Sequence, residues 1–482
     1  MTISIPPDHG RSWWLREALA LEEFAGSPAP ALEGDTDADV VILGGGYTGL
    51  WTAWFLKQLD PGVDVVLLEQ DICGGGPSGR NGGFMNSYWD DLTHLCAWFG
   101  DGAAQALCEA GEASVRAIGA FCDQQGFDAW FRGDGLYTAA TATSQVGEWA
   151  DSVITMDRLG RSDQLTVLST SEIRAKIDSP VFHGGTFTPF GATIHPARLV
   201  RGLRNAVLAA GVRVYEGTPV SRFGAGGTGG VGGAPAPALA QTPGGRVRAG
   251  AGVIAINAWA QHWKRFHRTI TVRGSFIVMT APAPQLLEAI GWSDGAGLSD
   301  YRAALHYVRT TPDGRIAFGI GGMQPDLART IDPRFAYDAG GIRVAIEDLH
   351  RMFPTFAGVP VEAGWGGPID VAGMHLPFFG TLEQGAVHYG LGYTGNGVAP
   401  AHMGGQILAH RALGRYSPLL ELPLVDLEPK RFPPEPIRSP GMLVANNAIL
   451  RRDRALDEEQ EPNPFTDFVA KLPRRLGYNL GP

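Results

Sequence analysis

The run Gly44-Gly45-Gly46-Tyr47-Thr48-Gly49 has the spacing GxGxxG, which is typical of a phosphate-binding turn. Gly44 allows a tight turn, Gly46 lets the backbone approach a pyrophosphate, and Gly49 lets a helix pack closely on a strand. Free N–H groups at the helix N-terminus would bind the anion. Glu69, 20 residues after Gly49, can accept hydrogen bonds from ribose hydroxyls and would repel a 2′-phosphate. We therefore predict a dinucleotide site, formed by Gly44, Gly46, Tyr47, Thr48, Gly49, Glu69 and Gln70.

A second glycine-rich segment, residues 73–83, follows directly after Glu69. Its glycines would leave backbone N–H groups accessible to a ligand, and Ser78, Arg80 and Asn81 add side-chain donors. A flexible surface loop is the alternative. Two glycine-rich segments beside one nucleotide-binding strand suggest a long ligand lying across the protein. The GxGxxG spacing itself does not separate FAD from NAD.

Both segments need a strand–helix–strand unit to position them. Residues 39–43 form a short apolar run typical of a buried parallel strand, residues 50–59 carry a helical pattern, and residues 63–68 resemble a second buried strand. The low-complexity segment 224–245 is expected to be a loop between partner strands. Further helices are predicted at 101–123, 146–160, 195–211 and 338–353, further strands at 212–215, 219–220, 246–248, 252–256, 270–280, 305–310 and 315–319, and a strand–turn–helix at 387–413.

Composition excludes several classes of protein. Of the 482 residues, 44% are hydrophobic and 18% are charged, which is not the balance of a disordered chain. A net charge of −10 disfavours a dedicated nucleic-acid binder. No apolar run is long enough for a transmembrane helix, and no signal peptide is recognisable, so we expect a cytoplasmic protein. Four cysteines without a CxxC pair indicate buried thiols rather than a disulfide framework, and no metal site is predicted.

The chain resembles the D-amino-acid-oxidase-like family of FAD-dependent oxidoreductases. The resemblance rests on Gly44–Gly49, Glu69, the segment PSGRNGG at 77–83, and GYTGNGV at 392–398. Within the family the chain is most similar to the gamma-glutamylputrescine oxidase branch, whose members carry a similar SGRNGG segment, with Asn86-Ser-Tyr88 after it. The match runs in order from about residue 38 to residue 415.

The resemblance implies an α/β fold, α+β overall, in which a Rossmann-like FAD-binding domain is interleaved with an antiparallel-sheet substrate domain. The FAD domain would comprise residues 37–100, 186–265 and 365–425, and the substrate domain 101–185 and 266–364, with a lead-in at 1–36 and a C-terminal extension at 426–482. By analogy, Val220 would meet the adenine through its backbone. Ser78, Gly79, Arg80, Asn81, Gly82 and Gly83 would line the isoalloxazine, and Gly395, Asn396, Gly397 and Val398 would cover its pyrimidine side. No His stands in 73–83 and no Cys in the late segment, so non-covalent FAD is expected.

FAD would accept a hydride from a substrate amine, which must first be neutral. A dry aromatic pocket would favour the neutral amine. Candidates for its wall are Tyr88, Trp89, Tyr301, Tyr307 and Trp365, with core packing as the alternative for each. His306 is a candidate base or orienting group, although a merely hydrogen-bonded histidine is the commoner case. Arg309 points to the opposite strand face from His306, and Arg273 would bind a substrate carboxylate or form an ion pair.

These inferences predict an enzyme that oxidises the C–N bond of a small amine to an imine. The amine would be a primary or secondary amine, a polyamine derivative or an amino acid, and O₂ would be the acceptor, giving H₂O₂. An amine dehydrogenase that passes electrons to a quinone or partner protein is the first alternative. A flavin-bearing subunit without its own turnover is the second, in which Trp13, Trp14 and the tail after residue 425 would form interfaces. The oligomeric state is left open.

Overall fold

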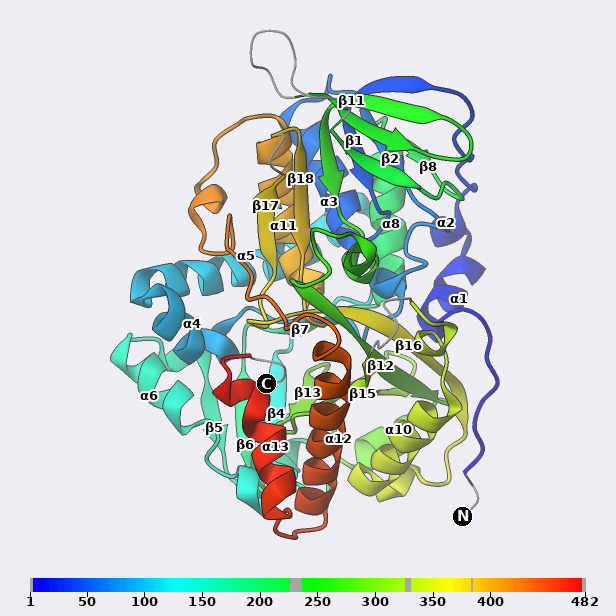
Figure 1. The fold of residues 1–482 in the computed structure, drawn as a ribbon. Coiled ribbons are helices and arrows are strands. Elements are labelled where there is room, and N and C mark those ends of the chain that lie inside the picture. The colour runs from blue at the N-terminus through cyan, green and yellow to red at the C-terminus, as the bar shows by residue number, and fades with distance from the viewer. Residues whose placement is uncertain (1–2, 226–235, 326–330, 383–384, 479–482) are drawn as a thin grey trace.

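The computed structural model describes residues 3–225, 236–325, 331–382 and 385–478. Two large sheets lie one above the other in the view of Figure 1, each covered by helices. Their strands come alternately from successive parts of the chain, which confirms the expected interleaved α/β architecture. The exact domain boundaries stay a prediction.

The first sheet is mainly parallel and has the order β17-β18-β11-β1-β2-β8, with β10 and β9 branching from β11. Only β17, β10 and β9 run antiparallel to their neighbours among the described strands. Its strands are β1 (Thr36–Leu43), β2 (Val65–Leu68), β8 (Arg213–Tyr215), β9 (Arg222–Ala225), β10 (Ala238–Gln241), β11 (Arg246–Ile254), β17 (Phe378–Thr381) and β18 (Val387–Leu391).

This sheet is buried on both faces where it carries the glycine-rich turn. The last four residues of β1 and all four of β2 are buried, as expected for apolar parallel strands. One face packs against helices, and the other carries a second apolar core that includes residues of β10, Phe266 and Phe378. The helices are α3 (Tyr47–Leu59), α5 (Asp101–Gln125), α8 (Pro196–Ala209) and α11 (Val398–Ala412).

The strands that flank the low-complexity segment pair with each other, because β9 is hydrogen-bonded to β10 and β10 to β11. This confirms that residues 224–245 lie between partner strands; residues 226–235 are outside the described residues. The two strands predicted at 246–248 and 252–256 are one continuous strand, β11. The strand predicted at 219–220 is wrong: those residues form no strand in the structure.

The second sheet has the order β16-β12-β15-β14-β13-β4-β6-β5 and is antiparallel except for the β13–β4 pair. Apolar side chains on one face pack against α10 (Ala339–Met352) and form a separate core. Its strands are β4 (Leu136–Ala139), β5 (Thr166–Leu168), β6 (Gly185–Thr188), β12 (Ile270–Thr280), β13 (Gly297–Asp300), β14 (His306–Thr310), β15 (Ile316–Pro325) and β16 (Val361–Ala372).

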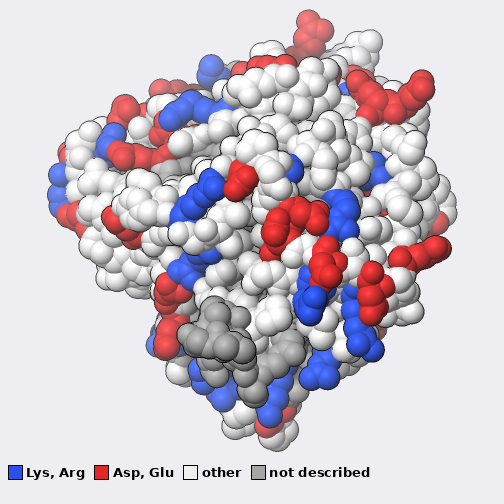
Figure 2. Space-filling model, turned by 90° about the horizontal axis from the view of Figure 1, so that it is seen from above, with Lys and Arg blue, Asp and Glu red and all other residues white. Residues whose placement is uncertain are grey.

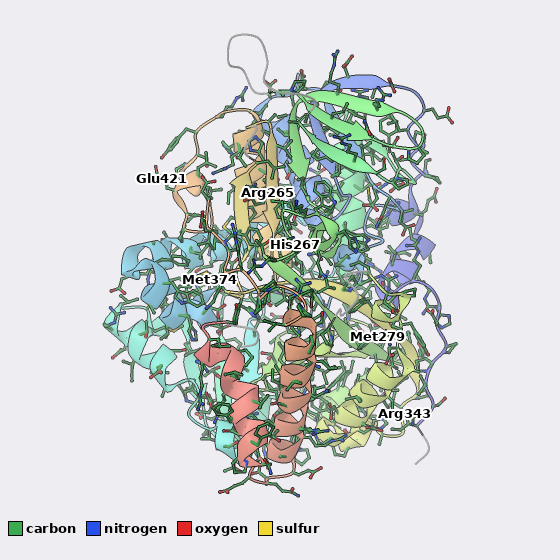
Figure 3. All side chains as sticks on the ribbon, in the orientation of Figure 1. Arg265, His267, Met279, Arg343, Met374 and Glu421 are labelled. Carbon is green, nitrogen blue, oxygen red and sulfur yellow. The ribbon has the colours of Figure 1, made fainter. Side chains whose placement is uncertain are left out.

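Smaller elements complete the chain. A two-stranded sheet pairs β3 (Phe84–Met85) with β7 (Ala192–Thr193). The short helices are α4 (Leu92–Phe99), α6 (Ala150–Arg158), α7 (Thr170–Lys176) and α9 (Pro284–Ala289). Figure 3 shows side chains filling the space between layers, with Met279 on the second sheet and Arg343 on α10.

Both ends of the chain are ordered into helices that the sequence analysis did not predict. The C-terminal extension forms α12 (Arg438–Asp457) and α13 (Pro464–Arg475), which pack on each other in front of the second sheet (Figure 1). The lead-in forms α1 (Trp13–Ala20) and α2 (Glu22–Ala25). Trp14 is 0% exposed and packs in the chain's own core, which speaks against the alternative in which it forms an interface.

Charged side chains of both signs are interspersed on the face seen in Figure 2, without a continuous patch of either sign on that face. No helix in the described part of the chain is long and apolar enough to cross a bilayer. The four cysteines are free thiols, and Cys73, Cys108 and Cys122 are buried, as expected; Cys96 is only partly buried.

A buried ionic cluster attaches α12 to the second sheet. His306, 0% exposed, contacts Asp300 through Nδ1 (2.6 Å) and Asp348 through Nε2 (2.9 Å). Arg302 approaches Asp457 of α12 at 3.3 Å. Burial and Arg302 lower the pKa of His306, but the two carboxylates outweigh them and the net shift is upward. His306 is therefore a structural residue of this cluster, held between two carboxylates.

We expect His306→Gln to destabilise the fold by about 3 kcal/mol at pH 6, because it removes the ring that pairs with the buried Asp300 carboxylate and with Asp348, and leaves Arg302 as their neighbouring cation. The folded pKa of His306 is raised, so its stabilising effect is complete below the unfolded value and is lost as pH rises through the folded value. The difference between variant and wild type should therefore shrink at pH 9. Urea unfolding at both pH values measures it, and an unchanged difference would contradict this prediction.

Candidate active site

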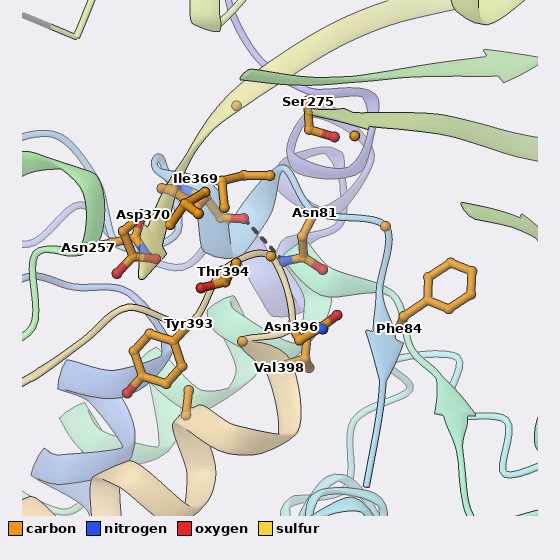
Figure 4. Close-up of a pocket in the computed structure, with 18 of the residues that line it drawn as sticks. Asn81, Phe84, Asn257, Ser275, Ile369, Asp370, Tyr393, Thr394, Asn396 and Val398 are labelled. Atoms are coloured by element: carbon orange, nitrogen blue, oxygen red, sulfur yellow. Dashed lines mark hydrogen bonds between the residues drawn. The ribbon is translucent and has the colours of Figure 1, made fainter. Parts of the chain in front are cut away.

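A pocket of about 770 Å³ runs between the two sheets. Its walls come from the β1–α3 turn, residues 74–82, the turn 393–398 before α11, and the facing strands of the second sheet. Figure 4 shows Asn81, Asp370, Thr394, Asn396 and Val398 close together around one part of it. The two glycine-rich segments and the late segment, far apart in sequence, thus meet at one cavity.

Glycine is required at two positions of the β1–α3 turn, because a side chain there would overlap neighbouring backbone atoms. Gly44 has φ +102°, and a Cβ there would lie 2.4 Å from the carbonyl oxygen of Ala255. A Cβ at Gly49 would lie 1.9 Å from the carbonyl oxygen of Gly44. Gly49 does not line the pocket, so it serves helix–strand packing, as its position in the motif predicts. Gly44, Gly46, Tyr47 and Thr48 do line it.

The N-terminus of α3 opens into the pocket beside the second glycine-rich segment. Ser78 Oγ accepts a hydrogen bond from the backbone N–H of Tyr47 at 2.9 Å. A Cβ at Gly46 would lie 2.9 Å from the same oxygen. The bare backbone at Gly46 and the hydroxyl of Ser78 therefore form a cradle at a helix N-terminus, where an anionic group is favoured.

Glu69 lines the pocket and also holds the turn together. Its carboxylate accepts hydrogen bonds from the backbone N–H groups of Gly45 (2.8 Å) and Asp71 (2.9 Å). Burial raises the pKa of Glu69, and these two bonds act in the opposite direction. Gln70 and Val220 also line the pocket. A ribose contact from Glu69 stays a prediction.

Hydrogen bonds within the second glycine-rich segment, and from it to β16, fix its conformation in the structure. Asn81 Nδ2 donates to the carbonyl of Pro77 (3.1 Å), and Gly83 N–H donates to Asn81 Oδ1 (2.8 Å). Arg80 donates to the carbonyl oxygens of Gly75 and Gly366. Ser78, Arg80, Asn81 and Gly82 line the pocket, whereas Gly79 and Gly83 lie behind it.

The lead-in supplies part of this support. Ser12 Oγ donates to the carbonyl of Gly79 at 2.5 Å, and Arg11 pairs with Asp71. Arg80 Nη2 donates to the carbonyl of Gly10 at 3.1 Å. The sequence analysis missed these residues, because Gly10-Arg11-Ser12 matches no motif.

The late segment lies where the analogy places it within the pocket: Gly395, Asn396, Gly397 and Val398 all line the cavity at the start of α11. Asp370, from β16, also lines it and accepts hydrogen bonds from the Gly392 N–H and from Asn257 Nδ2, both at 2.6 Å. Burial raises the pKa of Asp370 to about 7. A lone Asp in the run GGPID gave no signal for this role.

The four predicted catalytic residues do not converge. Tyr307 lines the pocket, and a Cβ at Gly82 would lie 2.8 Å from its ring. His306, on the opposite face of β14, belongs to the ionic cluster, and this placement argues against a catalytic role. Trp365 Nε1 donates to the carbonyl of Arg80 (2.8 Å), so its ring supports the glycine-rich segment from outside the pocket.

The other aromatic candidates divide in the same way. Tyr88 is buried in the core beside α5 and is not part of the pocket wall, and neither is Trp89. Tyr301 does line the pocket, where its ring centroid lies 5.7 Å from that of Trp149. Arg309 stacks near Trp14 on the opposite face from His306, as the strand alternation predicts, and Arg273 lines the pocket beside Asn446.

Comparison with known proteins gives this geometry a family. Residues 39–411 match the model of the FAD dependent oxidoreductase family, DAO. The chain belongs to this family. It is 29% identical to a probable oxidoreductase OrdL of Rhizobium meliloti, covering 87% of this chain and 92% of the relative. It is 28% identical to the gamma-glutamylputrescine oxidoreductase of Escherichia coli, covering 86% and 92%.

Solved structures share the fold at lower identity. Glycine oxidase from Geobacillus kaustophilus superposes with a TM-score of 0.67 at 20% identity, covering 81% of this chain and 99% of that one. L-Proline dehydrogenase from P. horikoshii superposes with a TM-score of 0.64 at 18% identity, covering 82% and 97%. The resemblance inferred from the glycine motifs is thus confirmed at the level of family and fold.

The enzyme is an FAD-dependent oxidoreductase, and its pocket fits that cofactor. The open helix N-terminus with Gly46 and Ser78 suits a pyrophosphate, and Glu69 stands at the end of β2, where a ribose would lie. Asn81, Gly82 and residues 395–398 also line the cavity, which leaves room for an isoalloxazine between the sheets. These residue assignments, and non-covalent attachment, are our proposal.

We expect Gly46→Ala to weaken FAD binding, because its methyl group would displace Ser78 Oγ from the cradle. Overpacking of this kind costs roughly 1–3 kcal/mol, which corresponds to roughly fivefold to 150-fold in affinity. Titration of the apoprotein with FAD, followed by flavin fluorescence, measures the change. Gly224→Ala is the matched control, because a Cβ at Gly224 meets no atom within 4 Å; equal loss in both variants would refute the cradle.

Proposed function

We propose that this enzyme oxidises the C–N bond of a cationic amine to an imine. The observation that carries the proposal is the charge of the pocket beyond the flavin segments. Its wall there includes four acidic side chains, Asp90, Asp91, Glu148 and Asp151, together with Arg474, so that acidic groups outnumber basic ones. Acidic side chains attract an amine, which is protonated in solution, and repel a simple hydroxy acid.

The second sheet offers a suitable surface for the reacting carbon. Tyr307 lies against Gly82, its hydroxyl 2.6 Å from Ser275 Oγ, and Phe84 packs edge-on to it with ring centroids 5.9 Å apart. These rings exclude water next to the segment proposed to line the isoalloxazine. Desolvation favours the neutral form of an amine, which is the form that can lose a hydride.

FAD supplies the hydride acceptor. The chain's own groups would draw in the ammonium form through the acidic wall, remove water from it at the Tyr307 side, and hold the C–H bond in place. Loss of a hydride from carbon and a proton from nitrogen converts R–CH₂–NH–R′ to the imine R–CH=N–R′, which water hydrolyses to an aldehyde and an amine. With O₂ as acceptor, the two electrons and two protons leave as H₂O₂.

The substrate class follows partly from the relative named a gamma-glutamylputrescine oxidoreductase. We infer that a polyamine derivative fits best, because a second cationic or polar group could reach the acidic wall while the reacting nitrogen lies near Tyr307. N-Methyl amino acids and D-amino acids are the other candidates. O₂ is the proposed acceptor, with a quinone or a partner protein as the alternative.

Anaerobic mixing of the purified holoenzyme with a panel of amines tests the proposal. Bleaching of the flavin absorbance by polyamine derivatives, but not by 2-hydroxy acids, is the expected result. Readmission of air should restore the absorbance within seconds for an oxidase, whereas slow recovery would indicate a dehydrogenase. Reduction by hydroxy acids alone would overturn the assignment to amines.

Asp91 should give the reaction a pH dependence. Burial, and then the neighbouring Asp90 carboxylate, raise the pKa of Asp91 to about 7. As pH rises through 7, Asp91 becomes charged and attracts the ammonium group more strongly, so KM for a cationic amine should fall. We expect Asp91→Asn to raise KM by about tenfold above pH 8 and to remove its change near pH 7. Steady-state kinetics from pH 6 to pH 9 measure this.

The control for this prediction is Asp332→Asn, because Asp332 is an exposed carboxylate that caps a short helix and does not line the pocket. It should leave KM unchanged at every pH. A KM profile for Asp91→Asn that matches wild type would show that Asp91 does not contact the substrate.

A further inference from the structure

The turn before α11 has a backbone that needs external support. Gly392, Thr394 and Gly395 have φ of +82°, +52° and +89°. Thr394 is β-branched, and such residues avoid the left-handed region. The turn leads directly into the first residues of α11, and residues 393–398 line the pocket. Something other than local preference must therefore hold the turn in this shape.

Asp370 supplies that support from the end of β16. One carboxylate oxygen accepts the N–H of Gly392 at 2.6 Å, and the other accepts Nδ2 of Asn257, also at 2.6 Å. The backbone carbonyl of Asp370 accepts the N–H of Thr394 at 3.0 Å. Thr394 Oγ1 in turn accepts the N–H of Ala372 at 3.1 Å. The side chain of Asp370 is 0% exposed.

These contacts join three walls of the same pocket. Asn257 follows β11 of the first sheet and itself has φ +46°, Asp370 belongs to β16 of the second sheet, and the turn precedes α11. Figure 4 shows Asn257 and Asp370 facing each other, with Thr394 and Tyr393 beside them. A buried carboxylate is costly unless its oxygens are hydrogen-bonded, and here both oxygens are used to hold backbone and side chain in place.

We propose that Asp370 is a positioning residue: it clasps the turn 392–395 to Asn257, and so holds residues 395–398 in the conformation that receives the flavin. The proposal rests on the proposed role of residues 395–398 at the flavin, and it concerns FAD binding rather than the identity of the amine. Because both carboxylate oxygens are engaged, Asp370 acts through the turn and not as a base toward substrate.

The test compares variants that break the clasp with one that preserves it. Asp370→Ala removes both acceptors. Asp370→Asn can keep a hydrogen bond to each partner. Its side-chain oxygen can accept the Gly392 N–H, and its amide can donate to Asn257 Oδ1 once the Asn257 amide turns over. Asn257 Oδ1 is buried and has no hydrogen-bond partner among the described residues. Asn257→Ala removes only the hydrogen bond between Asn257 and Asp370, and it is the milder variant if Asp370→Ala does not fold.

Each apoprotein would be titrated with FAD, followed by flavin fluorescence and by the visible spectrum at saturation. We expect Asp370→Ala to weaken FAD binding at least about tenfold and to shift the flavin spectrum. Asn257→Ala should weaken it less, and Asp370→Asn should stay close to wild type. FAD binding by Asp370→Ala as tight as wild type would overturn the proposal. So would Asp370→Asn binding as weakly as Asp370→Ala, since the charge and not the clasp would then matter.

Asp453→Ala is the matched control. Asp453 is also buried, and its carboxylate accepts the backbone N–H of Ala304 at 2.8 Å, but it does not line the pocket. It should lower thermal stability without changing FAD affinity or the flavin spectrum; an equal loss of FAD would mean that any buried carboxylate has the same effect, which would refute the clasp. Wild-type protein that binds FAD but is reduced by no amine would refute the proposed function and leave this inference intact.

Discussion

The close contact between β1 and the first turn of α3 is the constraint on which the rest of the structure depends. With only 1.9 Å between a Cβ at Gly49 and the carbonyl oxygen of Gly44, no larger residue can stand there without moving the helix. This contact fixes the direction in which α3 leaves the sheet, and so fixes where its unpaired N–H groups point. Ser78, Glu69 and the turn before α11 are all arranged around that point.

The two sheets contribute different kinds of groups to the pocket. The first sheet brings backbone: glycine turns, helix N-termini and hydrogen bonds from main-chain groups, which suit a large anionic cofactor of fixed shape. The second sheet and the neighbouring helices bring side chains, among them Tyr307, Tyr301 and the acidic residues. Substitution changes side chains but not backbone groups. The first sheet is therefore constrained by the cofactor, whereas the side chains of the second sheet are free to fit a substrate.

The glycine segments proposed for the cofactor could be recognised from the sequence, because the spacing of glycines is visible without a structure. Gly44, Gly46, Ser78, Asn81 and Val398 all line the pocket. The substrate half was predicted poorly because aromatic and charged side chains carry no signal of the face they occupy. Tyr307 and His306 are neighbours on one strand, yet one lines the pocket and the other lies in a buried ionic cluster.

The extensions at both ends were missed for a related reason. No helix was predicted after residue 425, but α12 forms there and is stabilised by tertiary contacts, including those of Arg302 with Asp453 and Asp457. Asp370 was missed because its function lies entirely in pairing with Gly392 and Asn257, which are distant in sequence. Only the folded chain shows such pairs.

The lead-in also has a consequence for the order in which the protein can assemble. Ser12 bonds to Gly79, Glu17 reaches His195 and Arg198, and Trp14 lies against Trp365. Ser12 bonds to a residue only 67 positions away, whereas Trp14 needs Trp365, so the lead-in can complete its contacts only when β16 is also in place. Contacts as distant in sequence as that of Trp14 with Trp365 form slowly, so the docking of the lead-in can finish only after the first and second sheets have come together.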